Sequence, residues 1–324
     1  MNRILVLTLL VSIFVTACQV ERTPLPIPTS TSTLTEDQLI PTPRYDPLPT
    51  STSTKKPIVT VTRVATSDAN TTSTPTVFKT ETATPILDEW KDLPVIPEVN
   101  TNVRDIYENG LLLGNDPNAF SIFGDCQSEP DEFLGVFDTD PLVVEDLAPE
   151  LRETVLNFEG SFDRESSTSQ DGTTPGALLW DQWHRGEYGC TFAETPVDCE
   201  LRINRPSFVI IQIGTHFESR NTDYLRKIIN QLIDAGVVPI LATKADNREY
   251  DNRVNRDMAL LATEFDLPLW NFWASLSDIP DRGLYTRDDR PLQGAIYLTD
   301  DAKEIHRMTG LAMLNAVWRA ATGN

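Results

Sequence analysis

From residue 88 onward, the hydrophobic and polar positions follow two alternating patterns. Short apolar runs rich in β-branched residues predict strands at 120–123, 207–213, 237–243 and 267–271. Apolar residues that recur every three or four positions predict helices at 145–158, 222–235 and 252–265, and a last helix capped by Thr299. Strands that alternate with helices are typical of a parallel sheet with helices on both faces. We therefore expect an α/β fold, a three-layer αβα sandwich around a parallel sheet of about five strands.

The first eighteen residues have a different pattern. A charged start with Arg3 is followed by an apolar run from Ile4 to Phe14 and by Val-Thr-Ala-Cys at 15–18. This order is typical of a signal peptide, here residues 1–17, and the run is shorter than the roughly 20 residues that cross a bilayer. Val-Thr-Ala-Cys resembles the lipobox of bacterial lipoproteins, in which the cysteine is diacylated. An ordinary secretory signal with an incidental Cys18 is the alternative.

If Cys18 is acylated, the protein is exported and anchored by membrane lipid to the outer face of the cell membrane. Two acyl chains on one residue anchor stably, whereas a single chain binds only marginally. The next segment, residues 18–87, is dominated by Thr, Pro and Ser and contains few aromatic residues. Such a segment cannot bury enough apolar surface to offset its ordering entropy. We expect a disordered stalk that carries one folded domain, residues 88–324.

The formal net charge of −21 argues against binding to nucleic acid and against electrostatic docking on anionic lipid. The three histidines are scattered and the four cysteines are too few for a zinc site, and no glycine-rich phosphate loop is present. We expect no metal and no cofactor, and a monomeric domain.

Besides Cys18, three cysteines remain. Cys190 and Cys199 lie close together in a segment without regular periodicity, and outside the cytoplasm this pair is expected to form a disulfide. Cys126 is then unpaired. It is either a buried, inert residue or one placed for reactivity.

Ligand sites in parallel sheets lie beyond the carboxyl ends of the strands. This rule selects residues 124–128, 214–217, 244–247 and the loop before Thr299. Lys244 and Asp246 are thus candidates for ligand contact, with a solvated loop as the alternative.

Two of these strand ends carry Gly124-Asp125-Cys126 and Gly214-Thr215-His216. The pair resembles the first and third blocks of the SGNH (GDSL-type) hydrolases, and the likeness covers roughly residues 118–320 in order and spacing. The resemblance implies an SGNH/flavodoxin-like fold and ester hydrolysis. In that family a serine attacks the acyl carbonyl, backbone N–H groups with a Gly and an Asn hold the oxyanion, and an Asp-x-x-His supplies the base.

The chain departs from the family at each catalytic block. Cys126 occupies the nucleophile position after Asp125, and Ser128 is a second hydroxyl nearby. Ser166 takes the place of the glycine of the second block, and His216 that of the oxyanion-hole asparagine. Tyr297 occupies the position of the catalytic histidine.

His306 cannot replace that histidine. It lies seven residues beyond Thr299, about 10 Å away along a helix.

Two functions remain open. The first is a surface-anchored hydrolase of ester (acyl) groups on extracellular substrates such as polysaccharides. Its predicted site comprises Cys126 as nucleophile, His216 as base and Asp125, with oxyanion or substrate contacts from these residues: Gly124, Ser128, Ser166, Gly214, Thr215 and Tyr297. The second is a catalytically degenerate protein that binds a glycan or peptide, with Trp180, Trp183, Trp270 and Trp273 either as stacking platforms or as packing residues.

Overall fold

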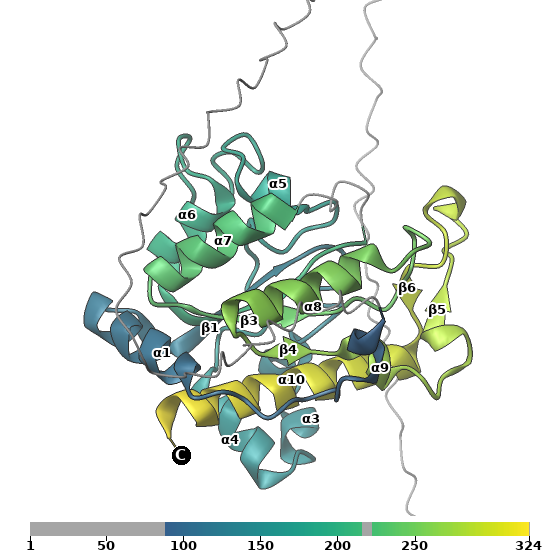
Figure 1. Cartoon of the computed structure of the whole chain (residues 1–324), viewed down its shortest axis with the longest axis horizontal. Coiled ribbons are helices and arrows are strands. Elements are labelled where there is room, and N and C mark those ends of the chain that lie inside the picture. Colours follow the sequence, from purple (N-terminus) through teal and green to yellow (C-terminus); the bar gives the residue numbers. More distant parts are fainter. Residues whose placement is uncertain (1–87, 216–221, 324) are drawn as a thin grey trace, which may run out of the picture. The chain divides into compact units, whose positions relative to one another are not determined.

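The computed structural model describes residues 88–215 and 222–323 (Figure 1). The predicted signal peptide, Cys18, the stalk and His216 lie outside the described residues. Their roles stay predictions.

The described residues form a four-stranded parallel sheet. Its strands are β1 (Asp116–Gly124), β2 (Pro206–Gln212), β3 (Val238–Ala242) and β4 (Leu269–Trp270), in the order β1-β2-β3-β4. Every residue of β2 and β3 is buried, which explains their nearly continuous apolar sequences. The predicted α/β class is confirmed and all four predicted strands are present. Residues 88–215 and 222–323 contribute four strands to this sheet, so a fifth strand stays a prediction.

A non-repetitive segment lies where a fifth strand would be, at the outer edge of β1. It forms a single parallel bridge, between Gly124 and Ser169. Side chains satisfy other backbone groups of this edge: Thr168 Oγ1 donates to the Ile122 carbonyl at 2.8 Å, and Asn204 Nδ2 donates to the Phe120 carbonyl at 3.2 Å. Because side chains replace a hydrogen-bonded ladder, the edge is covered without a strand pattern in the sequence.

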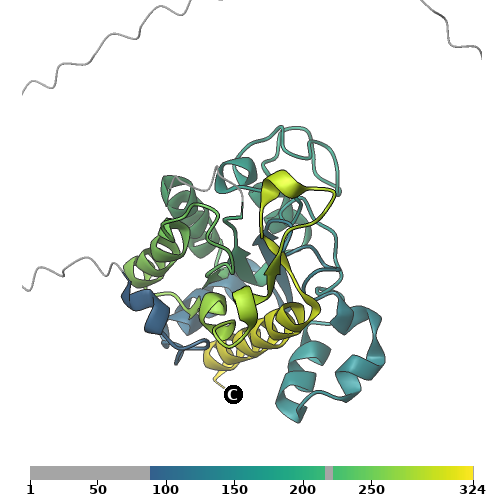
Figure 2. The same ribbon diagram turned by 90° about the vertical axis from the view of Figure 1, so that its right-hand side faces the viewer.

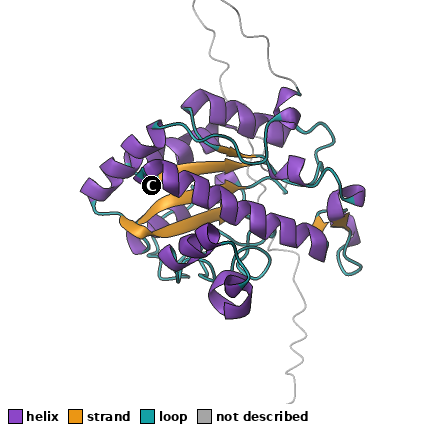
Figure 3. Ribbon diagram, turned by 90° about the horizontal axis from the view of Figure 1, so that it is seen from below, coloured by secondary structure: helices purple, strands orange, loops and turns teal. Residues whose placement is uncertain are grey.

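Helices pack against both faces of this sheet (Figure 3). On one face, α1 (Asn102–Leu113), α4 (Pro149–Asn157) and α10 (Asp300–Thr322) share an apolar cluster with Ile210 of β2. On the other face, α7 (Thr222–Asp234) and α8 (Arg253–Phe265) share a second cluster with Ile211. Each buried aliphatic side chain of this kind contributes about 1.5–3 kcal/mol to folding.

The predicted helices at 222–235 and 252–265 are confirmed within one residue at each end. The predicted helix at 145–158 is confirmed from 149 to 157 as α4, but its predicted start is wrong, because α3 (Pro141–Glu145) ends at 145 and Pro149 begins α4. Proline favours the first turn of a helix and cannot continue one.

The remaining elements are short: η1 (Glu89–Asp92), α2 (Val136–Thr139), α5 (Pro175–Leu178), α6 (Pro196–Ile203), α9 (Phe272–Ser275), η2 (Pro280–Gly283), β5 (Leu284–Tyr285), η3 (Pro291–Gln293) and β6 (Tyr297–Leu298). β5 and β6 form an antiparallel hairpin separate from the main sheet, on the right in Figure 1. Among the described helices, none is both long and apolar enough to cross a membrane.

Candidate functional site

Asp125 joins the ends of β1 and β2. Its Oδ2 accepts hydrogen bonds from the backbone N–H groups of Gly214 at 3.0 Å and Thr215 at 2.9 Å, and its Oδ1 accepts one from Thr215 Oγ1 at 3.2 Å. The two segments that carry the family resemblance therefore meet at one edge of the sheet. The buried carboxylate connects them through charge-assisted hydrogen bonds, which are stronger than neutral ones.

Cys126 lies at this edge with only 9% of its surface exposed. Burial raises the pKa of its thiol, and the nearby carboxylates of Asp125, Asp171 and Glu129 raise it further. Because the thiolate is the nucleophilic form, this environment opposes attack on an ester at neutral pH. The geometry thus favours the inert form of this cysteine, and its catalytic role stays a prediction.

Backbone donors that the resemblance assigns to the oxyanion are already bonded. The N–H of Gly124 donates to the Thr168 carbonyl at 2.9 Å, and those of Gly214 and Thr215 donate to Asp125. The Ser166 hydroxyl is buried and lies 2.8 Å from Thr168 Oγ1. An oxyanion would have to displace these partners, whereas a preorganised oxyanion hole keeps its donors free.

Ser128 is packed inside the molecule rather than presented to solvent. Its hydroxyl donates to the carbonyl and to Oε1 of Gln212, at 3.3 and 3.2 Å. A Cβ at Gly124 would overlap the Ser128 side chain, so this close approach requires a glycine.

Tyr297, at the start of β6, lies at a cavity that it shares with Cys126. The cavity has a volume of ≈ 200 Å³ and is lined by these residues: Cys126, Gln127, Glu129, Glu132, Asp171, Arg287, Arg290, Tyr297 and Leu298. The Tyr297 hydroxyl donates to Gln293, and burial raises its pKa. The residue at the position of the family's histidine is therefore near the nucleophile position, but as a protonated phenol it is not a base at neutral pH.

Acidic and basic side chains line this cavity, and its two arginines form ion pairs. Arg290 forms an ion pair with Asp171 at 2.8 Å, and Arg287 forms one with Asp289 at 3.1 Å. Glu129 Oε1 accepts the backbone N–H of Asp171 at 2.7 Å, and burial raises the pKa of Glu129. The sequence patterns did not indicate these residues, because they lie in loops without periodicity.

Neither described histidine lines the cavity. His306 is completely buried, its Nε2 lies 2.7 Å from Gln212 Oε1, and its ring stacks on Phe133 with centroids 4.0 Å apart. Burial lowers its pKa well below the usual value, so it is neutral. His184 pairs with Glu187 at 2.7 Å outside the site.

Other sequence expectations have clear outcomes. The disulfide between Cys190 and Cys199 is confirmed. Lys244 is not in a solvated loop, because it is buried with Asp246 at 2.8 Å and Glu249 at 2.6 Å.

The four tryptophans considered as platforms lie in different environments. Trp270 is buried in the core, and the ring of Trp273 packs against that of Trp90 with centroids 5.0 Å apart. Trp180, which is 55% exposed, and the half-buried Trp183 lie in the segment just before the loop that the disulfide closes. The packing interpretation therefore holds for Trp270 and Trp273.

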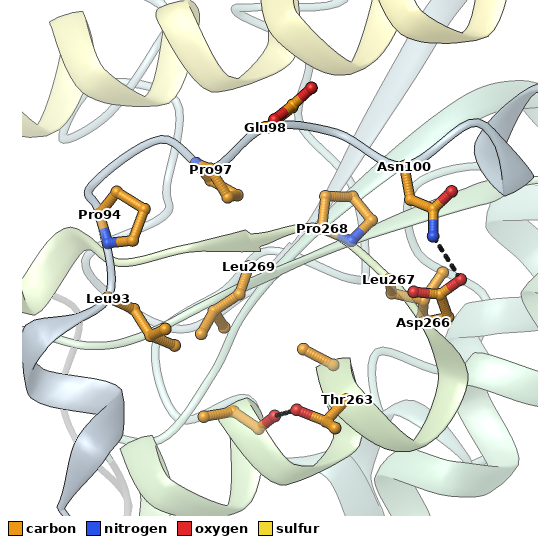
Figure 4. Close-up of a pocket in the computed structure, with 12 residues that line it drawn as sticks. Leu93, Pro94, Pro97, Glu98, Asn100, Thr263, Asp266, Leu267, Pro268 and Leu269 are labelled. Atoms are coloured by element: carbon orange, nitrogen blue, oxygen red, sulfur yellow. Dashed lines mark hydrogen bonds between the residues drawn. The ribbon is translucent and has the colours of Figure 1, made fainter.

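A second cavity, of ≈ 300 Å³, lies at the start of β4 (Figure 4). The segment from Leu93 to Asn100 forms one wall, and α8 with the following turn forms the other. Asn100 Nδ2 donates to Asp266 Oδ2 at 2.7 Å across it. None of the predicted site residues lines it.

Comparisons with known proteins add little to this geometry. No family model matches the sequence, and no curated protein matches it. Among solved structures, the chain is similar to a GDSL-like lipase from Bacteroides thetaiotaomicron, with 13% sequence identity and a TM-score of 0.35, over 67% of this chain and 97% of that one. At this TM-score the similarity assigns no role to any residue.

Proposed function

We propose that the domain binds a neutral, polyhydroxylated ligand, such as a sugar unit of an extracellular glycan, in the Cys126 cavity without cleaving it. The environment of Cys126 carries this proposal. Burial and the neighbouring carboxylates raise the pKa of the thiol and so favour its protonated form, and a thiol is a poor nucleophile. Tyr297, a phenol with a raised pKa, stands at the position of the family's base.

The lining of the cavity supports this class of ligand. Gln127, Glu129 and Arg290 line the cavity with planar polar groups. Gln127 Oε1 is buried without a hydrogen-bond partner among the described residues, and an amide oxygen of this kind can accept from a hydroxyl group. Tyr297 adds an aromatic ring that can stack on a sugar face. Since acidic and basic groups are both present, the cavity does not select strongly for one ligand charge. Its ≈ 200 Å³ is below the roughly 300–1,000 Å³ of sites for drug-sized molecules and suits a single ring.

The test is glycan-array binding followed by calorimetry with the best ligand, using the Cys18→Ala chain. Tyr297→Ala is expected to weaken binding at least about tenfold, since it removes an aromatic contact and a polar one. Tyr250→Ala is the matched control, because Tyr250 is exposed and does not line the cavity. Equal loss in both variants, or no ligand on the array, would contradict the proposal.

Ester hydrolysis is the second candidate, and one contact favours it. Asp125 precedes Cys126, Thr215 precedes His216, and Asp125 and Thr215 are hydrogen-bonded to each other. In this candidate His216, which lies outside the described residues, is the proposed base for Cys126. The proposed substrates are ester groups of extracellular polysaccharides.

Turnover of p-nitrophenyl acetate distinguishes the two candidates. If the domain only binds, Cys126→Ala and His216→Ala will leave the small background rate unchanged. A large loss of rate in both variants would make hydrolysis the function instead.

Lipid anchoring is also part of the proposal, and the lipobox-like residues 15–18 support it. Metabolic labelling with an alkyne-tagged palmitate is expected to mark the native chain in membranes and not the Cys18→Ala variant. A native chain that carries no label, or no more label than the Cys18→Ala variant, would contradict acylation at this residue.

We further infer an SGNH-like, three-layer arrangement in which the segment bridged to Gly124 replaces a fifth strand. The hydrogen bonds of Asp125 to Gly214 and Thr215 and the apolar clusters on both sheet faces support this interpretation.

A further inference from the structure

The outer part of the hairpin from Leu284 to Leu298 is held weakly to the rest of the domain. In the described part of the chain its strands β5 and β6 pair only with each other. Every side chain from 285 to 295 is exposed or half-buried, and Leu292 in η3 is 96% exposed. With no buried apolar side chain there, the outer part of the hairpin has the features of a segment that opens locally.

This hairpin forms one wall of the Cys126 cavity, and the body of the domain forms the other. The hairpin supplies Arg287, Arg290, Tyr297 and Leu298, and the body supplies Cys126, Gln127, Glu129, Glu132 and Asp171. In Figure 2 the yellow-green hairpin stands beside teal loops of the body. The ion pair of Arg290 with Asp171 joins the hairpin to the body.

Contacts of different strength join the two walls. At the base of the hairpin, Gln127 Nε2 donates to the buried Ile296 carbonyl at 2.6 Å, and the Thr299 N–H donates to the Gly283 carbonyl at 2.7 Å. Farther out, Arg290 of the hairpin forms an ion pair with Asp171 of the body, with 2.8 Å between the charged atoms. The two side chains are 41% and 40% exposed. An ion pair this exposed changes the equilibrium between the closed and open hairpin by roughly fivefold at most.

We propose that the outer part of the hairpin, between Gly283 and Gly294, is a lid over the Cys126 cavity and that the Arg290–Asp171 ion pair is its latch. The base remains attached while the outer part opens. Gly283 and Gly294 flank the moving part with φ of +63° and +77°, a backbone conformation that glycine adopts without strain. The lid controls access to the ligand site, so its biological role rests on the proposed function, although its opening does not require a ligand.

Cys126 itself reports the opening. In the full chain with Cys18→Ala, it is the single unpaired cysteine, because the other two form the disulfide. The experiment measures its rate of modification by methyl methanethiosulfonate, a neutral reagent, by intact-mass spectrometry. Arg290→Ala is expected to raise the rate roughly three- to fivefold. Adding 1 M NaCl is expected to raise the modification rate of Cys126 in the parent chain by a similar factor, because salt screens exposed ion pairs. The same salt is expected to leave the rate in Arg290→Ala nearly unchanged.

Arg287→Ala is the matched control. It removes an arginine from the same hairpin and cavity, but its ion pair with Asp289 lies within the hairpin. Its modification rate is expected to stay close to that of the parent. The charge exchange Arg290→Asp with Asp171→Arg is expected to restore slow modification.

The latch is excluded if Arg290→Ala reacts at the parental rate, or if Arg287→Ala accelerates the reaction equally. Circular dichroism of each variant verifies folding, and both exchanged residues are at the surface. Because no ligand is present, a negative result here leaves the binding proposal intact. Likewise, the absence of a ligand on the glycan array would not change the modification rates expected for the lid.

Discussion

At the scale of single residues, burial determines what the polar side chains near the ends of β1 and β2 do. Asp125 is a hydrogen-bond acceptor for the backbone of the neighbouring segment. The pKa of Cys126 is raised because the thiolate would be desolvated next to carboxylates. The pKa of His306 is lowered because its cationic form would be desolvated among aromatic rings. These residues look reactive in the sequence, and their surroundings disfavour the ionised thiol of Cys126 and the ionised imidazole of His306.

The lowered pKa of His306 predicts a stability that depends on pH. In the unfolded chain a histidine titrates near 6.5, so below that pH the unfolded state binds a proton that the folded state does not. The contribution of His306 is therefore fully present above about pH 6.5 and is lost as the pH falls, by about 1.4 kcal/mol per unit. Between pH 7.5 and 5.0, the parent chain is expected to lose about 2 kcal/mol more than His306→Gln. Urea unfolding at both pH values measures this difference, and equal losses would contradict it.

The close packing of Gly124 against Ser128 predicts a second effect. Gly124→Ala is expected to reduce the free energy of unfolding by about 1–3 kcal/mol, because the added methyl group overlaps the Ser128 side chain. The control is Gly176→Ala, where a Cβ would make only an ordinary contact, 3.5 Å from Tyr224. Ser128→Gly combined with Gly124→Ala tests the cause, since it removes the obstructing side chain. A double variant no more stable than Gly124→Ala would point to another cause.

At the scale of elements, three irregular segments surround the candidate site. The edge of β1 is covered by polar side chains, the hairpin of β5 and β6 forms a cavity wall, and a disulfide closes the loop that leads into α6. Each is held by a few specific contacts rather than by a periodic apolar face. The loop before α6 thus depends on its covalent link.

Removal of this disulfide by Cys190→Ser with Cys199→Ser is expected to cost about 2–3 kcal/mol of stability, the range for a short loop. Thermal unfolding of the double variant and of the parent measures the change. Because Cys126 does not participate in the disulfide, Cys126→Ser serves as the control for loss of a sulfur atom. A double variant as stable as the parent would show that the loop is held by its other contacts.

At the scale of the whole molecule, residues from Trp90 onward supply both apolar clusters. Trp90 belongs to the cluster on the α7 and α8 face, and Asn271 Nδ2 donates to the carbonyls of Trp90 and Leu93 at 2.9 Å each. The start of the described domain is therefore part of its core.

A chain that begins at residue 88 is expected to unfold at the same urea concentration as the full chain. One that begins at residue 94 is expected to lose about 3–5 kcal/mol, the usual cost of removing a buried tryptophan. Circular dichroism in urea measures both. A large loss in the chain that begins at residue 88 would mean that earlier residues stabilise the domain.

Local sequence patterns determined the α/β class, the four strands, most of the long helices and the disulfide, because periodicity and residue type are local properties that burial enforces. The sequence also predicted that Asp125 and Gly214 lie together, since carboxyl ends of parallel strands share one edge. Only the tertiary structure decided the ionisation state of Cys126 and His306, the bonded state of the backbone donors, and the pairing of Arg290 with Asp171. Those properties depend on desolvation and on contacts between residues far apart in the chain, and no local pattern encodes them.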